Sequence, residues 1–194
     1  DGIWYIRVPD DPDNGAWPTV KVASGTSEDV LAVGDIDGDG LDDVVASDSV
    51  SGKTIYWFRN PGNGAGNWSR TVVGDVTDWA DRAEIVDVDG DGRRDVVVAV
   101  ENGAASNATT YLFRSPREPA TRDWPRRSIA NQGSTNAMSA GDVDADGRVD
   151  IVTGEHKGLL RIRIWKTSDG GLTWTDTLVD SGKESHLGAR LVDL

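Results

Sequence analysis

The stretch Asp35-Ile-Asp-Gly-Asp-Gly-Leu-Asp-Asp43 occurs three times along the chain without gaps. The other two copies read Asp87-Val-Asp-Gly-Asp-Gly-Arg-Arg-Asp95 and Asp142-Val-Asp-Ala-Asp-Gly-Arg-Val-Asp150, and we name the three stretches Asp loops 1, 2 and 3. The first Asp of the pattern recurs once more at position 193, so the spacing is about 50 residues, the length of a structural repeat. The chain is therefore expected to be an array of one repeated unit.

Each repeat is expected to form four short β-strands. In the first repeat the alternation of apolar and polar residues predicts strands at 30–36, 43–46, 54–59 and 68–73. A sustained apolar stripe with helical spacing is missing, so little helix is expected. Four antiparallel strands in a unit of about 50 residues make one blade of a β-propeller. We therefore predict an all-β propeller of four-stranded blades, with the repeated Trp, Phe and Val residues packed between neighbouring blades.

The whole chain, residues 1–194, is expected to be one propeller domain or a segment of one. The predicted units are a partial blade at 1–25, complete blades at roughly 26–77, 78–132 and 133–182, and a second partial blade at 183–194. We expect the partial blades to continue in a larger propeller. The alternative is that a second chain pairs with the open edge and completes it.

The Asp loops are predicted to bind calcium. Each has Asp at positions 1, 3, 5 and 9 and Gly at position 6, which permits a sharp turn so that alternate side chains converge. Ca²⁺ takes about 6–8 oxygen ligands, which the carboxylates, the carbonyl at position 7 and water can supply. The candidate ligands are Asp35, Asp37, Asp39, Leu41 and Asp43; Asp87, Asp89, Asp91, Arg93 and Asp95; and Asp142, Asp144, Asp146, Arg148 and Asp150. The alternative is that these are acidic turns without an ion.

Other metal sites fit the sequence less well. An EF-hand would need Glu at position 12, where the three loops have Ala46, Val98 and Thr153, and its flanks would be helices. The chain has no Cys and only two His, which excludes thiolate ligands and disulfides and disfavours zinc. About three calcium sites are therefore expected.

The composition limits the classes of partner. Of 33 acidic residues, 27 are Asp, and the formal net charge is −13, which disfavours binding to a nucleic-acid backbone. The longest apolar run is well short of the roughly 18–20 residues that a membrane-spanning helix needs. Three bound calcium ions would bring the net charge from −13 to −7. Much of the acidity therefore belongs to the loops themselves.

The Asp-x-Asp-Gly-Asp-Gly-x-x-Asp pattern, followed by Val-Val and repeated at blade spacing, resembles the FG-GAP/VCBS repeat. That repeat is the calcium-loop blade of integrin-alpha-type propellers and of many secreted bacterial proteins. The resemblance implies that the twelve Asp of the loops are calcium ligands and that the protein is secreted and bacterial. In Asp loop 3, Ala145 replaces the usual Gly, a change that should leave the ligands intact.

A second resemblance lies in the last complete repeat. Thr167-Ser-Asp-Gly-Gly-Leu-Thr-Trp174 is similar to the Asp-box of sialidase-like propellers. In that motif the Asp closes a hairpin turn by accepting bonds from backbone amides, and the Trp lies beneath the turn. The motif implies a turn between the third and fourth strands and carries no sialidase activity by itself.

The face opposite the Asp loops is the expected ligand-binding face. Trp79 stands there where the other repeats have Ser, and a large aromatic side chain at this place suggests a stacking platform for a sugar ring. Asp78, Asp81 and Arg82 would be its polar partners. The alternative is that Trp79 only caps the adjacent blade.

Catalysis is a weaker hypothesis. His156 and His186 fall on this same face, and with Glu155 they are candidate acid/base groups of a polysaccharide lyase or glycoside hydrolase. A nucleophile motif is missing, so we lean towards a protein without enzymatic activity.

Basic residues also recur with the repeat. Arg7, Arg59, Arg114 and Lys166 end the third predicted strand of successive units. We interpret them as hydrogen-bond donors between blades or as exposed strand charges.

The leading interpretation is a secreted, calcium-stabilised propeller that serves as a module for binding or adhesion. Its expected partner is a glycan or a surface protein. The alternatives are the enzyme described above and a structural subunit of an oligomer or filament, self-associating through the incomplete blade. Fold alone does not choose among them.

Overall fold

The computed structural model describes residues 2–101, 108–183 and 191, and this part of the chain is entirely β-structure and irregular loops. The hairpin at the N-terminus consists of β1 (Gly2–Ile6) and β2 (Thr19–Ser24). Blade 1 contains β3 (Thr26–Gly34), β4 (Asp43–Asp48), β5 (Thr54–Arg59) and β6 (Ser69–Asp75). Blade 2 contains β7 (Trp79–Val86), β8 (Asp95–Glu101), β9 (Ala108–Phe113) and β10 (Arg126–Gln132). Blade 3 contains β11 (Thr135–Gly141), β12 (Asp150–Glu155), β13 (Arg161–Lys166) and β14 (Thr175–Ser181).

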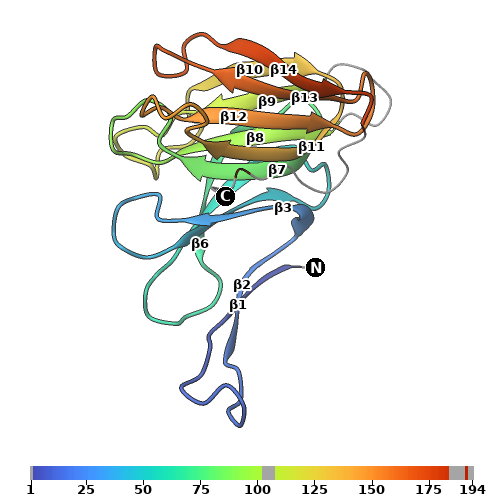
Figure 1. Ribbon diagram of the computed structural model, residues 1–194. Helices are drawn as coiled ribbons and strands as arrows, with labels where there is room; N and C mark the ends of the chain where they lie inside the picture. Colours follow the sequence, from blue (N-terminus) through green and yellow to red (C-terminus); the bar gives the residue numbers. More distant parts are fainter. Residues whose placement is uncertain (1, 102–107, 184–190, 192–194) are drawn as a thin grey trace.

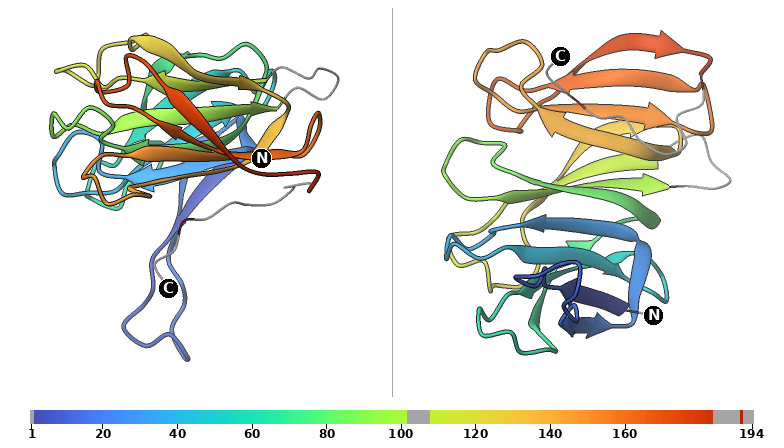
Figure 2. Two further views of the ribbon diagram at one scale, coloured as in Figure 1. Left: turned by 45° about the horizontal axis from the view of Figure 1, so that its top comes forward. Right: turned by 60° about the horizontal axis from the view of Figure 1, so that its bottom comes forward.

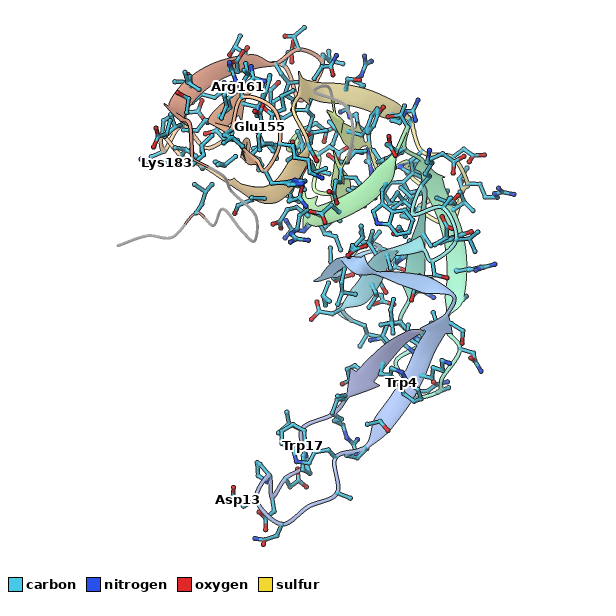
Figure 3. All side chains as sticks on the ribbon, turned by 90° about the vertical axis from the view of Figure 1, so that its right-hand side faces the viewer. Trp4, Asp13, Trp17, Glu155, Arg161 and Lys183 are labelled. Carbon is cyan, nitrogen blue, oxygen red and sulfur yellow. The ribbon has the colours of Figure 1, made fainter. Side chains whose placement is uncertain are left out.

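Each blade is a four-stranded antiparallel meander in which every strand pairs with the next one in sequence. The blades follow one another along a curve, with the N-terminal hairpin at one end (Figures 1 and 3). The predicted all-β fold of four-stranded antiparallel blades is confirmed. Within the described residues, none forms a helix with the length and apolarity needed to cross a membrane.

The hydrophobic core lies between neighbouring blades. Successive residues of a strand point to opposite faces of the sheet, and β8 uses both faces. Val96, Val98 and Val100 join the apolar cluster shared with blade 1, whereas Val97 and Ala99 join the cluster shared with blade 3. All five side chains are fully buried. The near-continuous Val run of this strand therefore follows from burial on both faces.

Two Trp residues that recur with the repeat, Trp68 and Trp124, lie at the joints between sheets, whereas Trp17 of the β1–β2 connection is 49% exposed. The Trp68 amide donates to the Val22 carbonyl of β2 at 3.0 Å, and the Trp124 amide donates to Val73 of β6 at 2.8 Å. Each bond links the residues just before the fourth strand of a blade to the last strand of the preceding sheet. Trp124 is also buried in the cluster between blades 1 and 2, as expected from its place in the repeat.

The N-terminal hairpin packs on blade 1 as the outer half of a blade would. Val22 and Ala23 form a core cluster with Val44, Ala46 and Phe58 of blade 1. The connection between β1 and β2 extends away from the blades (Figure 2). The alternation of residues in the predicted partial blade at 1–25 places its third and fourth strands at 3–8 and 17–22, and the structure shifts these bounds by one to two residues.

Leu191 lies against β11 of blade 3 in the way that Ile85 of β7 lies against β3 of blade 1. A Cβ built on Gly141 of β11 would lie 3.1 Å from the Leu191 side chain, and one built on Gly34 of β3 would lie 3.3 Å from Ile85 of β7. Gly34 and Gly141 each precede the first Asp of a loop, so the two contacts are equivalent. The partial blade predicted at 183–194 would begin with a strand at 187–194, and except for Leu191 that strand lies outside the described residues.

Candidate metal loops and the opposite face

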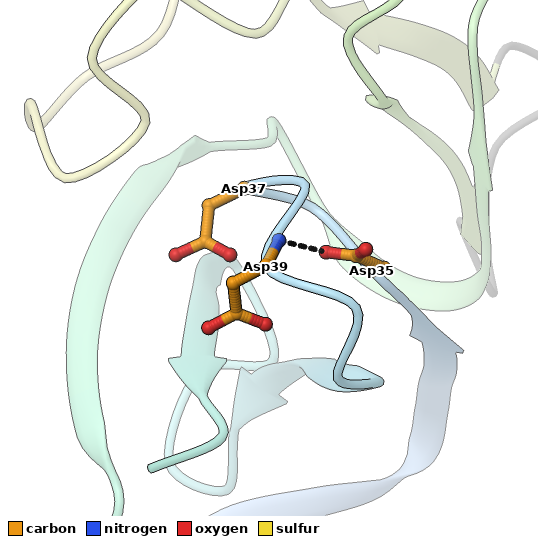
Figure 4. Close-up of side chains that lie close together, drawn as sticks. All are labelled: Asp35, Asp37 and Asp39. Carbon is orange, nitrogen blue, oxygen red and sulfur yellow. Dashed lines mark hydrogen bonds between the residues drawn. The ribbon is translucent and has the colours of Figure 1, made fainter. Parts of the chain in front are cut away.

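The first Asp of each loop organises the turn through backbone bonds. Asp35 accepts hydrogen bonds from the amides of Gly38, Asp39 and Gly40 at 2.8, 3.1 and 2.9 Å. Figure 4 shows this loop and the bond from the Asp39 amide. Asp87 accepts the equivalent three bonds in Asp loop 2. The loop geometry is therefore set by the chain itself.

The Asp at position 9 ties the loop to the rest of its blade. Asp43 accepts from the Ile36 amide at 3.2 Å and from the Asn60 amide, beyond β5, at 2.7 Å. Asp95 makes the equivalent two bonds in blade 2, and all three position-9 carboxylates are buried. Burial raises the pKa of Asp43 and Asp150, and it raises the pKa of Asp95 to about 6. Sequence reasoning identified these residues as ligands and missed this fastening role.

Three carboxylates converge in each loop. Oxygen atoms within 4.8 Å of one another come from Asp35, Asp37 and Asp39; from Asp87, Asp89 and Asp95; and from Asp142, Asp144 and Asp150. The Oδ1 atom of Asp37 is buried and has no hydrogen-bond partner among the described residues. A buried carboxylate oxygen without a partner is costly, and a hard cation would satisfy it. The loops therefore fit a metal ion bound by oxygen.

Three of the twelve predicted Asp ligands lie outside these triplets: Asp43, whose bonds are described above, Asp91 and Asp146. Asp146 accepts a bond from the Arg148 guanidinium at 2.9 Å, and Asp91 pairs with Arg93 in the same way. In each pair the Asp and the Arg are two positions apart in the same turn. The backbone carbonyls of Leu41, Arg93 and Arg148 belong to the same turns and stay predicted ligands.

Three of the four repeated basic residues, Arg59, Arg114 and Lys166, pair with the Asp loops of their own blades. Each contacts the Asp at position 3: Arg59 contacts Asp37, Arg114 contacts Asp89, and Lys166 contacts Asp144 at 2.6 Å. Arg59 also reaches Asp39 at 2.9 Å. The interpretation as links between blades was wrong for these three residues, because the end of the third strand lies beside the loop joining the first two. The basic residues and the Asp loops recur with the same spacing in the sequence, and this shared spacing was the signal that could have predicted the pairing.

The Asp-box forms the expected hairpin turn between β13 and β14. Asp169 accepts bonds from the hydroxyls of Thr167 at 2.9 Å and Thr173 at 2.6 Å, and from the Thr173 amide. The bonds from Thr173 come first in lowering the pKa of Asp169 to about 2. The turn also lies against Asp loop 2, because a Cβ built on Gly170 would be 3.0 Å from the Cβ of Asp89.

On the opposite face, the predicted ligand residues lie together at the start of β7 and just before it. They are Asp78, Trp79, Asp81 and Arg82. The Trp79 indole packs on the β4–β5 turn, where a Cβ built on Gly52 would overlap the ring, and its N–H donates to Asp29 at 2.7 Å. Arg82 contacts Asp81 at 3.4 Å. This packing favours the interpretation that Trp79 caps blade 1, and its role as a sugar platform stays a prediction.

Glu155 is held within its own blade. Its fully buried carboxylate accepts bonds from the Gly133 amide at 3.0 Å and from Arg161 Nε at 2.8 Å. Figure 3 labels Glu155 and Arg161 in blade 3. Burial alone would raise the pKa of Glu155, but the bonds from Arg161 and Gly133 outweigh it, so the pKa is lowered. An ionised, paired carboxylate is poorly suited to donate a proton.

His156 links blade 2 to blade 3. Its Nδ1 lies 3.2 Å from Ser134 Oγ, and its Nε2 lies 3.2 Å from Glu101 of β8. Serine, imidazole and carboxylate are the groups of a nucleophilic triad, but Ser134 is fully buried, so a substrate has no access to its hydroxyl. The arrangement is consistent with a structural link. His186, the other predicted acid/base group, lies outside the described residues.

A family model described as an FG-GAP-like repeat matches residues 35–98 and again 87–153. Each match begins at the first Asp of one Asp loop and ends shortly after the next loop. Together the matches span residues 35–153, more than half of the 194-residue chain. Compared with curated proteins, the chain has no significant match.

Proposed function

Because the chain belongs to the FG-GAP-like repeat family, we propose that it is a secreted, calcium-stabilised propeller module for binding or adhesion. Its expected partner is a glycan or a surface protein. The observation that carries the proposal is the convergence of three carboxylates in the same loop of three successive blades. FG-GAP-like repeats are typical of extracellular proteins, which supports secretion.

The chemistry of the loops favours calcium. Every side-chain donor in the three triplets is a carboxylate oxygen, which suits a hard divalent cation. Converging carboxylates repel one another, and an ion would remove both this repulsion and the unmet bonding capacity of Asp37 Oδ1. The residues that would hold the ions are the Asp of the loops together with the position-7 carbonyls.

Calcium would act on the stability of the blades. Each loop joins the first two strands of its blade, and its position-9 Asp bonds to the segment after the third strand in blades 1 and 2. If the free calcium concentration is 100 times the Kd of one folded loop, binding at that loop would add about 2.7 kcal/mol to the free energy of unfolding. The ions would therefore make the binding surface rigid without touching the partner.

Thermal unfolding of the chelated protein, followed by calcium addition, tests the metal proposal. We expect the melting temperature to rise with calcium and calorimetric titration to give three sites. Asp37→Asn should reduce three sites to two, whereas Asp13→Asn, in the exposed β1–β2 connection, should leave three. A melting temperature that is the same in EDTA and in millimolar calcium would refute the proposal.

A further inference from the structure

A pocket of about 390 Å³ lies between the Asp loops of blades 1 and 2. Asp35 and Asp37 of Asp loop 1 line one side. Arg93 and Arg94 of Asp loop 2 line the other, together with Arg117 from the β9–β10 connection. The pocket therefore brings three guanidinium-bearing residues to one site of a chain whose net charge is −13.

Two of these arginines have free hydrogen-bonding capacity. Arg93 is engaged, since it donates to the Ser115 carbonyl at 3.2 Å and pairs with Asp91. Arg94 and Arg117 are exposed and have no hydrogen-bond or ion-pair partner in residues 2–101, 108–183 or 191.

The described residues at the boundary between blades 2 and 3 are arranged differently at the equivalent place. At the boundary between blades 2 and 3 the Asp-box turn lies against Asp loop 2, and a Cβ built on Gly171 would be 3.2 Å from Val88. Position 8 of the loop, which is Arg94 here, is Asp42 in Asp loop 1 and Val149 in Asp loop 3. The cation at this position therefore does not belong to the repeated architecture of the blade.

We propose that this pocket binds the oxyanion of a small acidic ligand, a carboxylate or a phosphate, through Arg94 and Arg117. The planar guanidinium offers two parallel donors that match both groups. The inference rests on the proposed function, because calcium in Asp loop 1 would neutralise the acidic side formed by Asp35 and Asp37. The anion would then lie between a bound cation and two free guanidinium groups.

Three ligands that share a glucose ring test the inference on the full chain in millimolar calcium. Glucuronate supplies a carboxylate, glucose 1-phosphate supplies a phosphate, and glucose supplies neither. Calorimetry or NMR titration should show binding of at least one anionic ligand and none of glucose. The stronger of the two anions identifies the preferred group.

Arg94→Ala and Arg117→Ala should each raise the Kd at least about tenfold, as loss of a charge-assisted hydrogen bond predicts. Arg127→Ala, at an exposed position of β10, changes the net charge equally and should leave the Kd unchanged. All three sites are exposed, so melting temperatures should match the parent chain. Absence of binding by both anions, or binding that the Arg94 and Arg117 variants leave intact, would overturn the inference.

The calcium melting experiment separates the two proposals. A chain that calcium stabilises but that binds neither anion contradicts only the pocket. A melting temperature that does not change on chelation contradicts the metal proposal, whether or not the anions bind. Weaker anion binding after chelation supports the expected coupling between Asp loop 1 and the pocket.

Discussion

Ala145 of Asp loop 3 stands in a backbone conformation that favours glycine. Its φ is 58°, and the equivalent residues Gly38 and Gly90 have φ of 75° and 72°. A residue with a Cβ pays about 1–2 kcal/mol in this left-handed region. We therefore predict that Ala145→Gly stabilises the protein.

The expected magnitude follows from two opposing contributions. Relief of the left-handed conformation gains about 1–2 kcal/mol, and the extra freedom of Gly in the unfolded chain costs about 0.4–1 kcal/mol. The midpoints of these two ranges leave a net gain of about 0.8 kcal/mol, which is a rise of about 2–3 °C in melting temperature for a chain of this size. A Cβ built on Gly38 or Gly90 meets no atom within 4 Å, so steric contact adds nothing to the comparison.

Urea unfolding in EDTA measures the effect without a contribution from bound ions. Gly90→Ala is the reverse change and should lose about the same free energy as Ala145→Gly gains. Ala120→Gly, at an exposed turn residue whose φ is not positive, is the matched control and should be neutral or destabilising. The reasoning is refuted if Ala145→Gly lowers stability as much as Ala120→Gly does, or if Gly90→Ala costs nothing.

Three further changes test the roles assigned above. Arg161→Met should lower the free energy of unfolding in urea by about 3 kcal/mol, because it leaves the fully buried Glu155 carboxylate without its charged partner. Adding Glu155→Gln should recover part of that loss. Trp79→Ala should cost about 2 kcal/mol, since its ring packs on Gly52, while Trp79→Phe should cost less; a variant of unchanged stability would instead favour a free aromatic platform. Asp169 has a folded pKa of about 2, below its ordinary 3.8, so its stabilising effect is present above pH 4 and is lost as the pH falls towards 2. The difference in melting temperature between Asp169→Asn and the parent should shrink over that interval, and a constant difference would contradict the assignment.

The repeat, the strands and the positions of the Asp loops were predictable from sequence because they depend on local patterns. The run Val96–Val98 alternates between two core clusters, as a strand buried on both faces must. Asp at positions 1, 3 and 5 with Gly at 6 predicts a curled acidic turn, and the structure shows Asp35 closing that turn. Both features arise within a few residues of the chain.

Roles that depend on distant segments were settled only by the tertiary structure. Position 9 is an Asp in every loop, but its bond to Asn60 exists because β5 returns beside the loop 17 residues later. Arg59 is a strand-end cation in sequence and an ion-pair partner of Asp37 in the fold. The carboxylate pattern was therefore determined by sequence alone. The packing of the blades decides the rest. It determines which of those carboxylates face one another, which ones bond to a distant segment of the blade, and where a pocket opens between two loops.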